Sequence, residues 1–150
     1  MTECKRVFLD TSPFIYLLDG ATPYTKIMEY IINRLLEENI SLYTSTATIA
    51  EYLVIPYKEN NLLQVKDFFS FIEKAQINVV DINTEIAKQA AAFRSNYVGF
   101  KGMDALQLSA AYCNNVDIFL TNDKQLRQCK ELRCVMADEM YQILRDSDQK

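Results

Sequence analysis

The order of apolar and amphipathic segments in this chain predicts an α/β fold built around a mostly parallel sheet. Short apolar runs typical of strands alternate with longer segments in which apolar residues recur at helical spacing. Helical crossovers between successive strands give parallel pairing. The chain has 150 residues, with three Pro and three Gly and no visible linker, so we expect one domain over residues 1–150.

Five short apolar runs are the expected strands. The first run is apolar almost throughout, which is typical of a central parallel strand buried on both faces. The last run is short and is expected at an edge of the sheet. The runs lie at residues 6–10, 41–45, 77–82, 118–121 and 134–137.

Start and stop signals bound the first helices. Ser12 followed by Pro13 predicts an N-cap with proline at the first helical position, and Gly20 predicts the end of that helix. Thr22 before Pro23 repeats the start signal, and a helix is expected from there to about residue 38.

The later helices follow the same logic. Pro56 is expected to interrupt a helix at residues 46–57, and Asn83 to cap an alanine-rich helix. Leu106, Ala110 and Cys113 are expected on the inward face of a helix near the fourth strand. The later helices are expected at residues 46–57, 61–75, 84–95, 103–114, a short segment from 124, and 139–145.

The composition excludes several kinds of catalytic site. The chain contains no histidine, which removes Ser-His-Asp and Cys-His nucleophilic sites, histidine-based zinc centres, and nucleases with imidazole as acid or base. Any catalysis must therefore rely on carboxylates or a metal. The net charge of -4 does not indicate strong overall binding to nucleic acid, although a local basic patch can coexist with an acidic surface.

The apolar runs are much shorter than a membrane span, and no signal-peptide core follows Met1. We therefore expect a cytoplasmic protein that does not associate with a membrane. The cysteines show no Cys-x-x-Cys pair, so we expect reduced and mostly buried thiols. They are Cys4, Cys113, Cys129 and Cys134.

Four acidic residues follow strands or lie near helix starts. Asp10 and Asp123 come at the ends of the first and fourth strands, and Glu51 and Asp104 lie in helices that follow strands or loops. The carboxyl ends of parallel strands meet at one edge, so these acids should converge there. Crowded carboxylates repel each other unless a cation neutralises them, and oxygen ligands suit Mg²⁺ or Mn²⁺ better than zinc.

Structural roles compete with this interpretation. Glu51 matches the last residue of a capping box, and Asp104 and Asp123 suit the positive end of a helix. Asp10 is harder to explain structurally, because it follows a central strand and should face a cleft. Asp81, near the end of the third strand, is the further acid to consider.

Aromatic residues around the helix expected at residues 61–75 are too many for one core face. Most should be core, and the surplus predicts a self-association or partner surface. These residues are Tyr52, Tyr57, Phe68, Phe69 and Phe71.

The acid-bearing segments together resemble the PIN-domain ribonucleases, and among them the VapC-type toxins of toxin–antitoxin pairs. Four blocks occur in the family's order and at its approximate spacing. They are Phe8-Leu9-Asp10-Thr11-Ser12, Thr48-Ile49-Ala50-Glu51-Tyr52-Leu53, residues 104–111 from Asp104 to Ala111, and Leu120-Thr121-Asn122-Asp123-Lys124. The resemblance implies a three-layer α/β/α sandwich with four or five strands, and hydrolysis of RNA with one or two Mg²⁺ or Mn²⁺ ions.

The resemblance also implies a role for each acid. Asp10 and Asp104 match the principal metal ligands, and Asp123 matches a further ligand, bound directly or through water. Glu51 matches a ligand of a second ion or a base that positions water. Two ions about 3.5–4 Å apart would stabilise the attacking and leaving oxygens of phosphodiester hydrolysis.

Further residues support these acids in the same resemblance. Thr121 and Ser12 are polar supports whose hydroxyls would hold a carboxylate or a metal-bound water, and Asn122 competes with Asp123 for its place in the cleft. The family also implies a homodimer and often a small antitoxin. Candidates for contacts with substrate phosphates, or alternatively solvated surface cations, are Lys101, Lys124, Arg94 and Arg127.

Two other functions remain open at this point. A non-catalytic module that keeps the PIN scaffold for docking would not need the acids. A phosphoacceptor receiver-like domain would also be α/β with an acidic magnesium pocket, and would use Asp81 as acceptor. Receiver domains have paired acids after the first strand and a lysine after the fifth, and neither is evident here.

Overall fold

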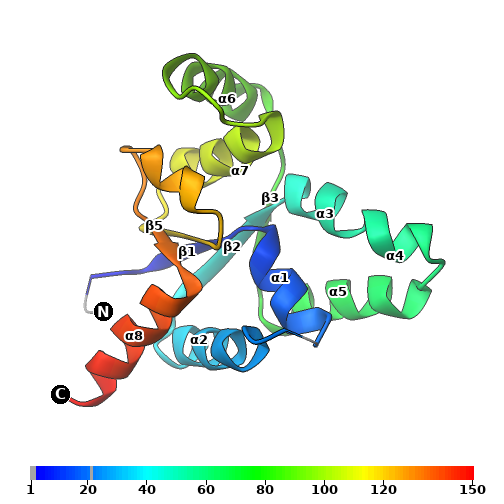
Figure 1. The fold of residues 1–150 in the computed structure, drawn as a ribbon, viewed down its shortest axis with the longest axis vertical. Coiled ribbons are helices and arrows are strands. Elements are labelled where there is room, and N and C mark those ends of the chain that lie inside the picture. The colour runs from blue at the N-terminus through cyan, green and yellow to red at the C-terminus, as the bar shows by residue number, and fades with distance from the viewer. Residues whose placement is uncertain (1–2, 21) are drawn as a thin grey trace.

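The structure is a computed structural model that describes residues 3–20 and 22–150, and it has helices on both faces of one sheet (Figure 1). Within these residues, five strands form an entirely parallel sheet in the order β3-β2-β1-β4-β5. The predicted α/β/α class and parallel sheet are therefore confirmed. The strands are β1 Arg6–Leu9, β2 Ser41–Ser45, β3 Asn78–Val80, β4 Ile118–Thr121 and β5 Cys134–Met136.

Strand β1 is central and separates two hydrophobic cores. Val7 and Leu9 enter one core and Phe8 enters the other, because successive side chains of a strand point to opposite faces. Phe8 lies in register with Phe119 of β4, and their rings stack with centroids 5.2 Å apart. The apolar first run is thus buried on both sides, as predicted.

The helices divide between the two faces of the sheet. α1, α2, α5 and α8 contribute to the core on the side of Val7, and α6 and α7 contribute to the core on the side of Phe8 (Figure 1). In the described part of the chain, no helix is long and apolar enough to cross a membrane. The helices are α1 Thr11–Leu18, α2 Thr25–Glu37, α3 Thr46–Tyr52, α4 Val54–Lys58, α5 Leu62–Lys74, α6 Thr84–Asn96, α7 Gly102–Cys113, the 3₁₀ helix η1 Lys124–Gln128, and α8 Ala137–Asp148.

The start of α1 differs from the prediction. Asp10 rather than Ser12 is the N-cap, and its Oδ1 accepts a hydrogen bond from the Thr11 N–H at 2.8 Å. Pro13 is consequently the third helical residue, where its missing N–H still costs no helical hydrogen bond. Gly20 lies just past the end of the helix with φ +66°, a conformation that favours glycine, so its predicted role is confirmed.

Other boundaries also shift for identifiable reasons. The break in the helix expected at residues 46–57 falls at Leu53, not at Pro56, because a proline ring clashes with the carbonyl four residues earlier. α2 begins at Thr25, whose N–H bonds the Thr22 carbonyl at 3.2 Å in a preceding turn. α8 starts earlier than expected, where Glu139 accepts from the backbone N–H of the N-cap residue at 3.1 Å.

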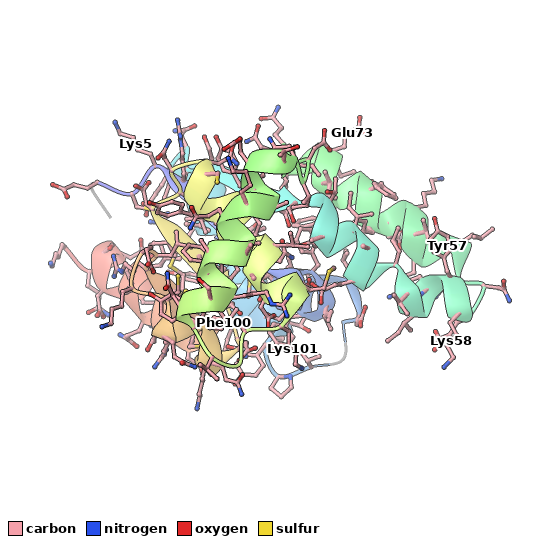
Figure 2. The ribbon with its side chains drawn as sticks, turned by 90° about the horizontal axis from the view of Figure 1, so that it is seen from above. Lys5, Tyr57, Lys58, Glu73, Phe100 and Lys101 are labelled. Carbon is pink, nitrogen blue, oxygen red and sulfur yellow. The ribbon has the colours of Figure 1, made fainter. Side chains whose placement is uncertain are left out.

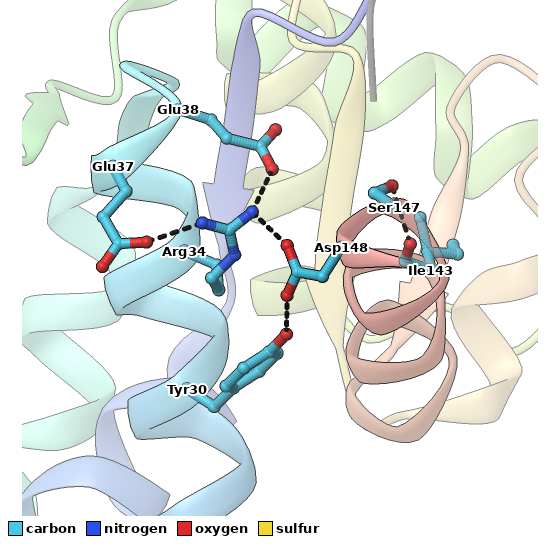
Figure 3. Close-up of polar contacts among 7 residues, drawn as sticks. All are labelled: Tyr30, Arg34, Glu37, Glu38, Ile143, Ser147 and Asp148. Carbon is cyan, nitrogen blue, oxygen red and sulfur yellow. Dashed lines mark hydrogen bonds and ion pairs between the residues drawn. The ribbon is translucent and has the colours of Figure 1, made fainter. Parts of the chain in front are cut away.

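A charged cluster fixes the end of α8 to α2 (Figure 3). Arg34 of α2 forms ion pairs with Glu37 at 2.6 Å and with Glu38 at 3.2 Å, three and four residues later in the sequence. It also pairs with Asp148 of α8. The Tyr30 hydroxyl donates to the same Asp148 carboxylate at 2.6 Å. One guanidinium therefore links both helices at the edge opposite the predicted site.

α4 and α5 form a hairpin that projects from the sheet, and Figure 2 shows Tyr57 and Lys58 at its far end. Of the aromatic residues expected around this region, some are in the core and others are exposed on the hairpin. Tyr52 and Phe68 are buried and stack at 4.6 Å, whereas Phe69 is 43% and Tyr57 56% exposed. Other large apolar side chains exposed on this hairpin are Val54, Ile55, Leu62 and Leu63.

The cysteines are free thiols, as expected, but most are not buried. Cys129 is buried, Cys4 and Cys134 are partly buried, and Cys113 is exposed. Cys113 lies in the last turn of α7, on the side away from the core, which contradicts its expected inward position.

Candidate metal centre

The four predicted acids follow the topology to one edge of the sheet. Asp10 directly follows β1, Asp123 lies two residues after β4, and Glu51 lies in α3, which follows β2. Asp104 is in the first turn of α7. β2 and β3 extend the sheet to one side of β1, and β4 and β5 to the other, so a topological switch point lies beside β1. In open α/β sheets, ligands bind beyond the strand ends at such a point.

Two donors hold the carboxylate of Asp10. Its Oδ1 accepts from the Thr11 N–H at 2.8 Å, and its Oδ2 accepts from the Thr121 hydroxyl at 2.7 Å. Burial nevertheless raises the pKa of Asp10 to about 6, and the negative charges of Glu51 and Asp104 add to the increase, while the two donors offset part of it. No cation among residues 3–20 and 22–150 therefore compensates the charge of an ionised Asp10.

Asp104 and Asp123 interact in the same region. Burial raises the pKa of Asp104, the charge of Asp123 raises it further, and a backbone hydrogen bond and the charge of Lys101 act in the opposite direction. Asp123 caps η1, because its Oδ1 accepts from the Gln125 N–H at 3.0 Å. The Asp123 N–H donates to the Thr121 hydroxyl at 3.1 Å, so one threonine contacts the segments of two acids.

Glu51 does not have its predicted capping role. The N-cap of α3 is Ser45, whose hydroxyl accepts from the Ala47 N–H at 3.1 Å. Glu51 is exposed, and its Oε1 accepts from the Thr11 hydroxyl at 3.0 Å. Thr11 therefore bonds Glu51 through its side chain and Asp10 through its backbone.

Ser12 and Asn122, two of the polar residues expected to support the acids, make no hydrogen bond to an acidic side chain in the described part of the chain. The Ser12 hydroxyl is shielded from solvent and has no hydrogen-bond partner in the described part of the chain. Asn122 is turned to other elements: its Nδ2 donates to the Tyr16 hydroxyl at 2.9 Å, and its Oδ1 accepts from the Ala137 N–H at 3.4 Å. Asn122 thus holds α1 and α8 beside β4, in place of the competition with Asp123 that we expected.

The four predicted cations are exposed, but they are not equivalent. Lys101 immediately precedes α7, on the connection from α6 that Figure 2 shows, and Lys124 opens η1. Arg94 lies in the last turn of α6. Arg127 forms an ion pair with Glu139 of α8. Lys101 and Lys124 are therefore nearest in sequence to the acid-bearing helix starts.

Gln107 is not among the predicted site residues, although it is fully buried on α7 one turn after Asp104. The Ser45 hydroxyl donates to its Oε1 at 2.5 Å, and its Nε2 donates to the Thr48 hydroxyl. The available signal was a polar residue three positions after an acid in an otherwise apolar helix.

The donor set fits a hydrated Mg²⁺ or Mn²⁺ and does not fit a closed protein cage. Over residues 3–20 and 22–150, no group of three or more Asp, Glu or Cys side chains is gathered closely enough to hold an ion unaided. Mg²⁺ usually keeps several waters and binds through one or two carboxylates. Among the described residues, Asp10 has no cation that compensates its charge, and the buried hydroxyl of Ser12, two residues later in the sequence, has no hydrogen-bond partner; both observations suit an ion with its water.

The sheet order contradicts the receiver-like alternative. In a sheet of order 2-1-3-4-5, the third strand is central and carries its ligand at the switch point. Here β3 is an edge strand, and Asp81, which follows it, is exposed. Asp81 is therefore not placed as the acceptor of a central acidic pocket.

Comparison with known proteins assigns this fold to a family. The sequence profile of the PIN domain matches residues 7–132. A chain of the VapBC2 complex of Rickettsia felis, bound to a DNA fragment from its promoter, is similar with a TM-score of 0.71 and 17% identity, over 87% of this chain and 98% of that one. No curated protein matches the sequence.

Two further solved structures show the same likeness. The Mycobacterium tuberculosis toxin VapC20, which is described as cleaving the sarcin-ricin loop, has a TM-score of 0.67 and 14% identity over 85% of this chain and 98% of that chain. FitAcB of Neisseria gonorrhoeae has a TM-score of 0.65 and 18% identity over 87% and 97%. At such identities the likeness establishes the fold, and the profile covers most of the sequence: this chain belongs to the PIN-domain family.

Proposed function

We propose that this protein is an endoribonuclease that uses Mg²⁺ or Mn²⁺ to hydrolyse RNA phosphodiester bonds, and that it is the toxin of a VapBC-type pair. The observation that carries the proposal is that Asp10 and Asp123 follow the two neighbouring strands at the switch point, and that the charges of Glu51 and Asp104 act on Asp10, in a chain without histidine. Membership in the PIN family and the similarity to VapC20 support the choice of RNA as substrate.

Each acid has a distinct part in this proposal. Asp10 and Asp104 would hold the ion, and Asp123 would bind it directly or through water. A bound divalent ion lowers the pKa of its water and neutralises charge on the phosphate. Thr121 and the Thr11 N–H fix both oxygens of Asp10, which limits the reorganisation needed on binding.

Glu51 and the cations complete the proposed site. Glu51 is exposed and is held on one oxygen by the Thr11 hydroxyl, so its other oxygen is free to accept a proton from water. Lys101 and Lys124 are exposed ammonium groups beside the acid-bearing helix starts, and they suit contacts with RNA phosphates. Their positive charge would draw a polyanion to the acid-bearing edge of the sheet.

The proposal is tested by RNA cleavage with Mn²⁺ in wild type, Asp104→Asn and the control Asp81→Asn. Substitutions around a metal already cost about 10–100-fold in activity, so loss of a direct ligand should cost more than about 100-fold. Asp81→Asn changes an exposed acid at the same edge and should cleave normally. Undiminished cleavage by Asp104→Asn contradicts the assignment, and RNA binding without cleavage by wild type supports the non-catalytic alternative.

The proposal includes assembly with a second copy and with a small antitoxin. The α4–α5 hairpin presents large apolar side chains to solvent, among them Leu62 and Leu63, which are 69% and 68% exposed. Contiguous exposed apolar surface often marks a protein interface. The related VapBC2 structure contains both members of such a pair.

A further inference from the structure

A buried polar network lies directly beneath the acid-bearing edge of the sheet. Gln107 of α7, Ser45 and Thr44 of β2 and Thr48 of α3 are all fully buried. The Gln107 Oε1 accepts from the Ser45 hydroxyl at 2.5 Å, and its Nε2 donates to the Thr48 hydroxyl. One side-chain amide thereby joins three elements that the chain brings together from distant positions.

The network continues to two of the four acids. The second partner of Gln107 Nε2 is the Thr11 hydroxyl, at 3.4 Å. Thr11 in turn donates its hydroxyl to Glu51 Oε1 at 3.0 Å and its N–H to Asp10 Oδ1 at 2.8 Å. The position of Thr11 therefore influences both carboxylates, and Gln107 contacts Thr11 from inside the protein.

The opposite end of the network reaches the end of β1. The Thr44 hydroxyl lies 2.9 Å from both the Leu9 carbonyl and the Thr48 hydroxyl. Leu9 is the residue before Asp10, so the contact holds the backbone from which that acid projects. Gln107 itself is one turn after Asp104 on α7. Its hydrogen bonds to Ser45 and Thr48 hold that helix against β2 and α3.

The volume of the site alone gives no reason for a glutamine at this position. A methionine would occupy similar space in the core without the desolvation cost of an amide. A fully connected polar network does specify one arrangement of the elements that share it, because a displaced partner would leave a buried polar group unsatisfied. The elements joined here are the ones that carry Asp10, Glu51 and Asp104.

We propose that Gln107 is a positioning residue of the metal centre: its buried amide holds α7 against α3 and holds Thr11 toward Glu51, and so sets the spacing of the carboxylates. The inference rests on the proposed metal-dependent function. Gln107 contacts neither substrate nor ion and acts through Thr11, Thr48 and Ser45. Groups that orient metal ligands typically contribute about 10–100-fold to metal affinity.

The test compares Mn²⁺ affinity, measured by electron paramagnetic resonance of the free ion, with thermal unfolding of the same samples. Gln107→Met should weaken Mn²⁺ binding by about tenfold or more, and its cleavage of RNA should recover at correspondingly higher Mn²⁺. The matched control is Gln64→Met. Gln64 also links separate segments, through Asp19 at 2.8 Å and the Tyr52 hydroxyl at 3.0 Å. Neither contact involves Thr11 or one of the four proposed site acids, so binding should stay within about twofold.

A second pair of variants, at Thr11, tests the positioning role even if Gln107→Met does not fold. Thr11→Val removes the hydroxyl that connects Gln107 with Glu51, and it should weaken Mn²⁺ binding by about tenfold. Thr11→Ser keeps the hydroxyl, and its Mn²⁺ affinity should be close to that of the wild type. If both Gln107→Met and Thr11→Val fold, the double variant should bind little worse than either single one, because the two residues act on one chain of contacts.

The outcomes separate this inference from the proposed function. Unchanged Mn²⁺ affinity in folded Gln107→Met, or equal losses in Thr11→Val and Thr11→Ser, overturns the positioning role while metal-dependent cleavage by wild type stands. Absence of Mn²⁺ binding in wild type overturns the metal centre, and the positioning role with it. Weaker binding in Gln107→Met with an unaffected Gln64→Met supports the role, whether or not RNA is the substrate.

Discussion

Asp10 should destabilise the metal-free protein at neutral pH, and Asp10→Asn should therefore raise its stability. Burial raises the pKa of Asp10 from 3.8 to about 6, with the charges of Glu51 and Asp104 adding to the effect. Between pH 3.8 and 6 the folded state binds more protons than the unfolded state at this residue. The free energy of unfolding consequently falls as the pH rises through this window, and the loss is complete above about pH 7.

The size of the effect follows from the two pKa values. The difference between about 6 and 3.8 corresponds to about 3 kcal/mol of stability lost on ionisation. For a chain of this length, that amounts to about 6–12 °C in melting temperature. Asparagine removes the charge and keeps an oxygen for the Thr11 N–H at the N-cap, and its amide nitrogen can donate to the Thr121 hydroxyl oxygen in place of the bond that Asp10 Oδ2 accepts, so little is lost in exchange.

The assay is thermal unfolding of wild type, Asp10→Asn and Asp81→Asn with EDTA at pH 4 and pH 8. Asp10→Asn should melt above wild type at pH 8 and close to it at pH 4. The exposed Asp81 should show no such pattern. Mn²⁺ should raise the melting temperature of wild type and affect Asp10→Asn much less. A lower melting temperature for Asp10→Asn at pH 8, or a difference that persists at pH 4, refutes the argument.

Two further predictions concern the scaffold. Asn83→Ala should lower the free energy of unfolding by about 1 kcal/mol in urea denaturation, because Asn83 Oδ1 accepts from the Ile86 N–H at 3.0 Å and caps α6. Asn83→Ser should retain most of that stability, and an equal loss in both variants would contradict the capping role. Phe119→Ala should cost about 3–5 kcal/mol by the same measurement, since its ring is fully buried and stacks on Phe8. A loss below about 1 kcal/mol would show that the core on the side of Phe8 does not depend on this pair.

The fold was accessible from the sequence because strong local patterns agree with the global topology. The apolar run at residues 6–10 can be satisfied only by burial on both faces, and the central position of β1 supplies it. Gly20 and Asn83 each have a conformational or capping role that few other residues share. The acids at the strand ends then follow from parallel pairing, without any knowledge of side-chain contacts.

The buried network was not accessible in the same way. Ser45 and Thr48 are ordinary polar residues in a sequence, and their contact with Gln107 spans 62 and 59 positions of the chain. Whether a polar side chain on a helix faces solvent or core depends on the rotation of that helix. In α7, Gln107 is buried and Cys113 is exposed, the reverse of what the spacing of apolar residues predicts for Cys113. Tertiary packing decided the question, and local spacing carries little information about it.

Helix capping and metal binding are compatible roles for one acidic side chain. Asp10 and Asp123 each accept a backbone N–H at a helix start, yet a carboxylate has about four lone-pair sites and gives only one of them to that bond. The cap fixes the side-chain rotamer, so a ligand held in this way loses less conformational freedom when an ion binds. The proposed dual role makes asparagine the informative substitution. Asparagine keeps the cap and removes the charge. Alanine would remove both, so a loss of cleavage could not be assigned to either one.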